Sequence, residues 1–196
     1  MLHIVDDEEV IRDSLMWLAE SRHIQATAYD SASQFLSVLD SDYVFNDDGD
    51  CLLLDMRMPE MSGASLFEAI SARGFRARMP VIFLTGHADV PMAVDSLKRG
   101  AFDFFEKPFN DNKLMDRVQE ALLASVQGGL QADVQARLAT LSARERETLG
   151  FILEGKMNKV IADEMGITMR TVEVHRASIF TKMGVRTAVE LARLIQ

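Results

Sequence analysis

Apolar and polar positions along the first 125 residues follow two alternating patterns. Short apolar runs are typical of strands, and apolar residues spaced three or four positions apart are typical of helices. The runs predict strands over residues 2–5, 24–29, 51–54, 80–84 and 101–105. The spaced residues predict helices over residues 8–21, 31–39, 65–73, 91–99 and 111–126. Apolar strands that alternate with helices favour a five-stranded parallel sheet covered on both faces, an α/β fold.

The end of the chain predicts helices only. Ser142-Ala143-Arg144-Glu145 is a capping box, in which a serine and a glutamate three positions later exchange hydrogen bonds at a helix N-terminus. Three more helices are predicted over residues 158–165, 169–183 and 187–195. Gly166-Ile167-Thr168 is a tight turn between the first two of these. Helix, glycine-containing turn, helix is a DNA-reading unit, so we expect an all-α, four-helix domain over residues 137–196.

Residues 126–136 join the two parts and are predicted to be a linker. Gly128-Gly129 favours an irregular chain because glycine is a poor helix former. The other residues of this polar segment suit a helix, so a continuous helix through it stays an alternative. The expected organisation is an α/β domain over residues 1–125, a linker over 126–136 and a helical domain over 137–196.

Charge is divided unevenly between these parts, although the whole chain carries −9. Residues 136–196 carry ten Lys or Arg and seven Asp or Glu, whereas residues 1–135 carry 11 and 23. This asymmetry indicates an acidic module joined to a modestly basic one. A single cysteine, Cys51, excludes a disulfide within the chain. No stretch has the pattern of a signal sequence or a membrane span, so we expect a cytoplasmic protein without membrane contacts.

Polar residues follow four of the predicted strands: Asp6-Asp7, Asp55, Thr85 and Lys107. The carboxyl ends of parallel strands lie at one edge of the sheet, so these residues can converge there. Three neighbouring carboxylates repel one another unless a cation lies between them, and Mg²⁺ (or Mn²⁺) takes such oxygen ligands. Asp55 could then act as the nucleophile toward a phosphoryl group, with Lys107 offsetting the charge that develops and the Thr85 hydroxyl bonding a phosphate oxygen.

These residues stand in motifs that resemble the receiver domain of two-component response regulators. The motifs are Asp6-Asp7, Leu54-Asp55-Met56-Arg57-Met58-Pro59 with Gly63, Thr85-Gly86 and Lys107-Pro108. The segment from Thr85 to Val94, which includes His87-Ala88-Asp89, resembles the FixJ branch. The resemblance implies a flavodoxin-like, doubly wound fold in which Asp55 is the phosphoacceptor. It also implies metal ligation by Asp6, Asp7, Asp55 and the Arg57 backbone carbonyl, and a switch formed by Thr85 and Phe104.

The helix over residues 169–183 has two predicted faces. Val172, Ile179 and Met183 should pack on the preceding helix through Ile161, Ala162 and Met165. The opposite face carries Arg170, Glu173, Val174, Ala177 and Thr181. Apolar side chains can meet thymine methyl groups, and a glutamate can accept a hydrogen bond from cytosine. Phosphate contacts are expected from Lys159, Thr171, His175, Arg176, Ser178 and Lys182.

Residues 141–196 resemble the LuxR/FixJ-type output domain. The motifs are Leu141-Ser142 with Arg144-Glu145, Gly155, Asn158-Lys159, Ile161-Ala162, Thr171-Val172-Glu173-Val174-His175-Arg176 and Lys182-Met183. The resemblance implies that Glu173, Val174 and Ala177 read bases. It also implies that the last helix dimerises on DNA, so that the double-stranded site is an inverted repeat.

Both resemblances together predict a transcription factor that a sensor histidine kinase phosphorylates and that forms a homodimer when phosphorylated. RNA polymerase is a further expected partner. The chain is not expected to be an enzyme beyond catalysing its own phosphorylation and dephosphorylation. Whether phosphorylation acts through dimerisation or through release of the output domain stays open. The competing hypotheses are a phosphate-handling hydrolase and a module that binds another protein, and salt-dependent DNA affinity separates the last from the main hypothesis.

Overall fold

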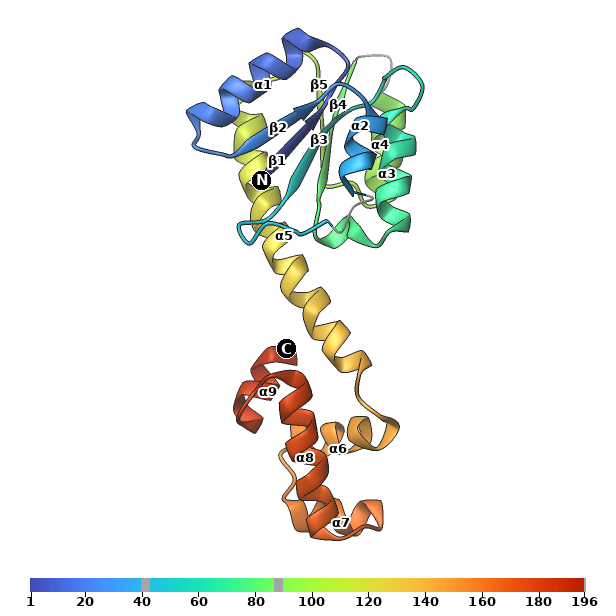
Figure 1. Cartoon of the computed structure of the whole chain (residues 1–196), viewed down its shortest axis with the longest axis vertical. Helices are drawn as coiled ribbons and strands as arrows, with labels where there is room; N and C mark the ends of the chain where they lie inside the picture. Colours follow the sequence, from blue (N-terminus) through green and yellow to red (C-terminus); the bar gives the residue numbers. More distant parts are fainter. Residues whose placement is uncertain (40–42, 87–89, 196) are drawn as a thin grey trace. The chain divides into compact units, whose positions relative to one another are not determined.

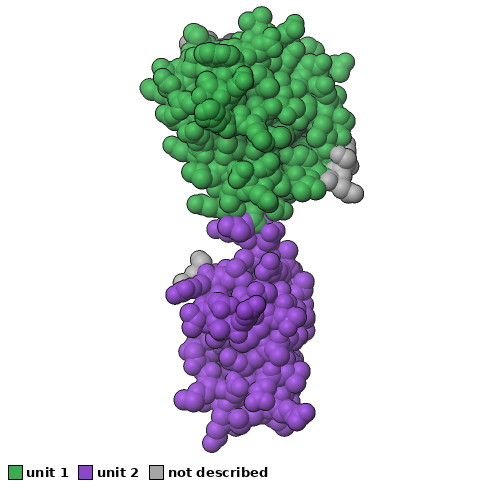
Figure 2. Space-filling view, turned by 60° about the vertical axis from the view of Figure 1, so that its left-hand side comes forward, with its two compact units in different colours: residues 1–129 green, residues 130–196 purple. Residues whose placement is uncertain are grey.

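The computed structural model describes residues 1–39, 43–86 and 90–195. The chain divides into two units, Met1–Gly129 and Leu130–Gln196 (Figure 2). The segment His87-Ala88-Asp89 lies outside the described residues. Within the described ranges, no helix combines the length and the apolar character that crossing a membrane requires.

Five parallel strands form the centre of the first unit, in the order β2-β1-β3-β4-β5 (Figure 1). They are β1 Leu2–Val5, β2 Ala26–Tyr29, β3 Cys51–Asp55, β4 Val81–Thr85 and β5 Asp103–Glu106. Asp55 pairs with Leu84 and Thr85 pairs with Glu106, so the strands end at one edge of the sheet. The five-stranded parallel sheet predicted from the apolar runs is confirmed.

Helices cover both faces of this sheet (Figure 1). They are α1 Glu9–Ser21, α2 Ala32–Leu39, α3 Gly63–Ala72, α4 Val90–Lys98 and α5 Asp111–Ala139, with a 3-10 turn at Phe75–Ala77. The first core cluster packs α2 and α3 on one face of the sheet, and the second packs α1 and α5 on the other. The doubly wound arrangement is therefore confirmed. Helix α3 begins two residues before the predicted start, because Ser62 Oγ caps it by accepting from Ser65 N at 3.2 Å.

Helix α5 does not end at residue 126, where the sequence pattern predicted its end. It continues through the expected linker to Ala139, so the alternative of a continuous helix is the one observed. Gly128 explains the difference: a Cβ there would lie 1.9 Å from the Ala77 carbonyl oxygen. This glycine allows the helix to pass close to a neighbouring backbone rather than interrupting it.

The second unit contains four further helices around one core. They are α6 Ala143–Leu153, α7 Asn158–Met165, α8 Met169–Met183 and α9 Ala188–Ile195. The core joins Val172, Ile179 and Met183 to Ile161, Ala162 and Met165, as the sequence pattern predicted. Val134 and Leu138 from the end of α5 pack against the same core. Gly166 ends α7 with φ of 65°, a left-handed conformation that glycine adopts without strain.

Candidate functional site

Lys107 connects two of the carboxylates that the strand-end pattern predicted to converge. Its Nζ donates to Asp6 Oδ2 at 2.8 Å and to Asp55 Oδ1 at 2.6 Å. The Glu8 carboxylate lies 3.7 Å from the same ammonium group. Lys107 follows β5, Asp6 follows β1 and Asp55 ends β3. The parallel sheet thus brings together residues that lie as many as 101 positions apart in the sequence.

Backbone hydrogen bonds fix both carboxylates in place. Asp6 is fully buried, and its Oδ1 accepts from Glu8 N at 2.9 Å. Asp55 is 6% exposed, and its Oδ2 accepts from Arg57 N at 2.6 Å. Arg12 Nη1 donates to the Asp6 carbonyl oxygen at 2.8 Å, a contact that the sequence analysis did not foresee. The two acids are therefore held rigidly by neighbouring backbone rather than by solvent.

Gly63 brings the start of α3 against the phosphoacceptor candidate. Its N–H donates to the Met56 carbonyl at 3.1 Å. A Cβ at this position would lie 2.1 Å from the Asp55 carbonyl oxygen, closer than two non-bonded atoms can approach. Only a residue without a side chain leaves the Asp55 backbone where it is.

The electrostatics of this cluster are unbalanced. Burial raises the pKa of Asp55, and the hydrogen bond from Lys107 offsets this only in part, while the charge of Asp6 adds to it. Burial alone would lower the pKa of Lys107, but its hydrogen bonds to Asp55 and Asp6 raise it overall. Two carboxylates face one ammonium group, so an additional cation would be favoured there.

The donor atoms fit a hard divalent cation by their chemistry. Asp6 and Asp55 offer carboxylate oxygens within reach of one ammonium group, and Asp7 is exposed beside Asp6. Mg²⁺ and Mn²⁺ prefer such oxygens and retain water at their open positions. Over the residues that the structure describes, no group of three or more histidine, cysteine or acidic side chains is arranged to hold a metal ion, and Lys107 contacts both Asp6 and Asp55.

Of the two predicted switch residues, Thr85 ends β4 beside the cluster and Phe104 lies on β5 opposite Phe83. The carbonyl of Thr85 accepts from Lys107 N at 2.8 Å, whereas its buried hydroxyl donates to Gly86 O at 3.1 Å. Phe104 is partly buried and packs against the core cluster that contains Phe83. The structure thus brings Asp6, Asp55 and Lys107 together directly, and brings Thr85 to them through its backbone.

Helix α8 presents the predicted base-reading residues to solvent. Thr168 caps the helix by accepting from Thr171 N at 3.2 Å. Val174 is 61% exposed, and Glu173 and Ala177 are exposed beside it. Arg170, predicted on the same face, is also exposed. Among the predicted phosphate contacts, Lys159 and Lys182 are exposed and Thr171, His175, Arg176 and Ser178 are partly buried. Arg176 also lies over the Phe180 ring at 5.5 Å from its centroid.

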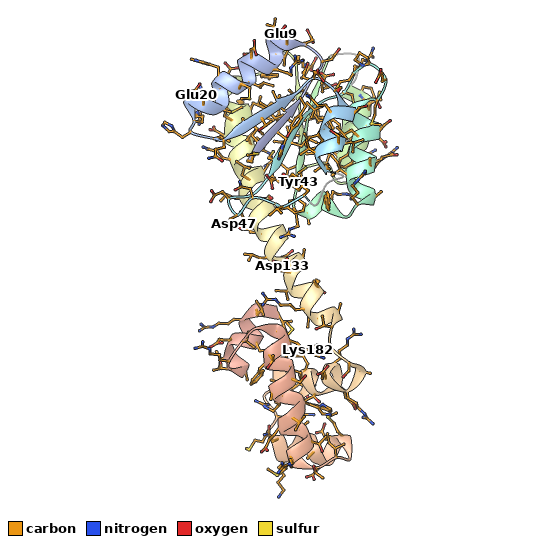
Figure 3. All side chains as sticks on the ribbon, viewed as in Figure 1. Glu9, Glu20, Tyr43, Asp47, Asp133 and Lys182 are labelled. Atoms are coloured by element: carbon orange, nitrogen blue, oxygen red, sulfur yellow. The ribbon has the colours of Figure 1, made fainter. Side chains whose placement is uncertain are left out.

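Ser178 and Lys182 have partners that the sequence analysis did not foresee. Ser178 Oγ donates to Glu145 Oε1 at 2.6 Å, and Lys182 Nζ donates to Glu145 Oε2 at 2.7 Å (Lys182 is labelled in Figure 3). Together with the Ser142 N–H, these bonds lower the pKa of Glu145 to about 2. The sequence identified Glu145 only as part of a capping box, because no local signal links it to residues more than thirty positions later.

Two family descriptions match the chain. The response regulator receiver domain matches residues 2–119, and the bacterial regulatory proteins of the luxR family match residues 139–195. The C4-dicarboxylate transport transcriptional regulatory protein DctR of Rhodobacter capsulatus is 50% identical over 98% of this chain and 98% of its own length. The transcriptional regulatory protein FixJ of Azorhizobium caulinodans is 42% identical over 98% of this chain and 90% of its own length.

Solved structures resemble the chain over both units. The response regulator StyR is 35% identical with a TM-score of 0.68, over 99% of this chain and 96% of its own. Full-length FixJ from B. japonicum is 38% identical with a TM-score of 0.59, over 98% of this chain and 94% of its own. The similarity therefore covers the acidic cluster and the α8 helix in the same proteins.

Proposed function

This chain belongs to the two-component response regulators that join a receiver domain to a LuxR-type DNA-binding domain, and we propose that phosphorylation of Asp55 by a partner histidine kinase switches its dimerisation and promoter binding. The observation that carries the proposal is the contact of one ammonium group, Lys107, with Asp6 and Asp55. The relatives are transcription regulators, so the chemistry serves a signal rather than the turnover of an outside substrate.

The chemistry begins with a carboxylate oxygen of Asp55 as nucleophile. It attacks the phosphorus of a phosphohistidine; the new P–O bond forms as the P–N bond breaks, and the imidazole nitrogen keeps the electron pair and takes up a proton. Lys107 offsets the negative charge on the transferring oxygens. Mg²⁺ or Mn²⁺, held by Asp6, Asp7, Asp55 and the Arg57 carbonyl, would supply further charge compensation. Attack of water on the same phosphorus later returns phosphate and restores Asp55.

The switch follows from a change of partner at Thr85. Its hydroxyl donates to Gly86 O before phosphorylation, and a phosphate oxygen on Asp55 would be a stronger, charged acceptor. Phe104, on the strand that pairs with Thr85's strand, then repacks with the surface formed by residues 91–105. A ligand favours the state that offers it more contacts, so phosphate shifts the receiver toward this state.

The output is DNA binding through α8. Glu173, Val174 and Ala177 read bases, and Lys159, Arg170, Thr171, His175 and Arg176 supply further contacts. Dimerisation through α9 gives an inverted-repeat promoter site, to which RNA polymerase is recruited. We assign the receiver to residues 1–125 and the DNA-binding domain to residues 137–196. Residues 126–136 form a helical connection between them.

Light scattering tests the switch directly. The full chain is measured in Mg²⁺ with and without beryllofluoride, a phosphoryl mimic, and compared with Asp55→Asn. Asp13→Asn is the matched control, because it removes an exposed carboxylate of α1. We expect a doubling of molar mass in the native chain and in the control, and none in Asp55→Asn. A molar mass that stays constant in every protein would reject dimerisation, leaving release of the DNA-binding domain as the coupling.

A further inference from the structure

Glu145 has more partners than helix capping requires. Its Oε2 accepts from Ser142 N at 2.7 Å, which completes the capping box of α6. The same oxygen accepts from Lys182 Nζ at 2.7 Å, and Oε1 accepts from Ser178 Oγ at 2.6 Å. The Glu145 side chain is 7% exposed and that of Lys182 is 35% exposed, so a buried carboxylate meets a cation that reaches the surface. One carboxylate thus joins the start of α6 to the second half of α8.

Lys182 is committed to this cluster by a second bond. Its Nζ also donates to the Thr140 carbonyl at 3.1 Å, and its side chain is only 35% exposed. If Lys182 turned to a DNA phosphate, Glu145 would stay behind as a buried carboxylate without its charged partner. Leaving one member of a buried pair uncompensated is strongly unfavourable. The position of Lys182 against Glu145 and Thr140 is therefore the stable one.

We infer that Glu145, Ser178 and Lys182 form an anchor that sets the position of α8 for DNA reading, and that Lys182 is a positioning residue rather than a phosphate contact. The inference rests on the proposed function, because it takes α8 to be the helix that reads DNA. Val174 and Ala177 lie on the same helix, each within about one turn of Ser178. A shift of α8 against α6 would therefore move the reading side chains away from the base edges.

Salt dependence distinguishes an anchor from a phosphate contact. Each phosphate contact contributes about 0.9 to the slope of log affinity against log salt, because binding releases one condensed counterion. Lys182→Met should lower affinity for a selected duplex about tenfold while leaving that slope unchanged. Lys159→Met is the matched control, because Lys159 is exposed on α7. Loss of its phosphate contact should reduce the slope by about 0.9.

Glu145→Gln gives a second test, in which two explanations predict opposite changes in DNA affinity. Removing a negative charge from a DNA-binding domain should raise affinity if only long-range electrostatics matter. The anchor predicts lower affinity for the selected duplex, because a neutral amide holds Lys182 weakly. Ser178→Ala keeps both charges and removes one bond of the anchor, so it should give a smaller loss in the same direction. Lys182→Arg keeps the cation, so it should lose less affinity than Lys182→Met does.

The experiment uses the full chain activated with beryllofluoride and Mg²⁺. The probes are a duplex that the native chain selects from a random library and a scrambled duplex of the same composition. The ratio of the two affinities is measured for each variant, because partial unfolding lowers both affinities equally and leaves the ratio unchanged. We expect the ratio to fall in Lys182→Met and Glu145→Gln and to hold in Lys159→Met.

Two outcomes would overturn the inference, and they differ from each other. If the native chain selects no duplex, both the proposed function and the anchor are rejected. A native chain that binds its duplex, with Lys182→Met reducing the salt slope as Lys159→Met does, removes the anchor alone and makes Lys182 a phosphate contact.

Discussion

The acidic cluster of the first unit (Asp6, Asp55 and Lys107) and the proposed reading helix of the second unit, α8, are built in opposite ways. Asp6, Asp55 and Lys107 lie far apart in the sequence, and three different strands place them within one set of hydrogen bonds. The reading residues of α8 are neighbours in the sequence and point to solvent. The first site is buried and depends on the sheet, whereas the second is exposed and depends on one helix.

This difference decides where each site is vulnerable. The acidic cluster is sensitive at its own side chains, because Asp6 and Asp55 are buried and Lys107 is partly buried beside them, with little solvent to replace a lost partner. If α8 reads DNA as proposed, we expect it to be sensitive at a residue that does not face DNA, because its exposed side chains can act only if the helix is in place.

Replacing Lys107 by methionine should have the largest effect on the first site. The change leaves Asp6 and Asp55 without their shared ammonium group. Removing one group that offsets charge in a transition state costs about a hundredfold or more in rate. The rate of phosphorylation from acetyl phosphate, followed with a radioactive label, measures the loss. Lys98→Met, at an exposed position in the last turn of α4, should keep the native rate; an equal loss in both would mean that net charge matters and not the contact.

Two glycines test how tightly the units are packed. Gly63→Ala places a Cβ 2.1 Å from the Asp55 carbonyl oxygen, and such overpacking costs about 1–3 kcal/mol in the free energy of unfolding of the first unit. Gly150 lies in α6 with open space around its Cβ position, so Gly150→Ala should stabilise the second unit by about 0.5–1 kcal/mol.

Urea unfolding, followed through hydrogen exchange of peptides from each unit, measures both changes. Stability of the first unit that is unchanged in Gly63→Ala would show that α3 can move away from Asp55 without cost. In that case the glycine has no part in fixing the acidic cluster.

Much of the first unit follows from its sequence. The uninterrupted apolar runs at Cys51–Leu54 and Pro80–Leu84 predicted buried parallel strands, and the strand-end rule then predicted that Asp6, Asp55 and Lys107 converge. Both arguments need only local pattern and the geometry of parallel sheets. The exposed and buried faces of α8 followed from helical periodicity in the same way.

What the sequence pattern missed depends on contacts between distant segments. Gly128 weakens a helix by its own propensity, yet it lies inside α5 because its missing side chain makes room for the Ala77 carbonyl. Glu145 has a complete local explanation as a capping residue, so nothing nearby signals its bonds to Ser178 and Lys182. Local propensity contains no information on such partners, and tertiary contacts override it.

A fall in pH should change the stabilities of the two units in opposite directions, through Asp55 in the first unit and Glu145 in the second. The pKa of Asp55 is raised, so its charge destabilises the first unit above that pKa, and the cost disappears as the pH falls below its ordinary value of about 3.9. Asp55→Asn should therefore stabilise the first unit at pH 7, by an amount that vanishes below about pH 4. The pKa of Glu145 is lowered to about 2, so its stabilisation is complete above its ordinary value of about 4.3 and is lost as the pH falls through the lowered one.

Glu145→Gln is accordingly the opposite case. It should destabilise the second unit at pH 7, and the difference should persist to about pH 4 before it fades. Urea unfolding in EDTA at several pH values, followed through methionine methyl signals of each unit, measures both variants. If both variants change the free energy of unfolding of their units in the same direction, the pKa shifts assigned to Asp55 and Glu145 are contradicted.

The smallest effect on DNA affinity is expected at Glu173, an exposed acid on the proposed reading face of α8. A carboxylate beside DNA phosphates opposes binding to any sequence, so Glu173→Gln should raise affinity for a scrambled duplex severalfold. If Glu173 accepts a hydrogen bond from cytosine, the same change should weaken discrimination at one base pair by about 1–3 kcal/mol. Fluorescence anisotropy on single-base variants of the selected duplex measures both. Asp163→Asn removes an exposed acid of α7 instead; loss of discrimination there as well would mean that overall charge, and not a base contact on α8, sets the selectivity.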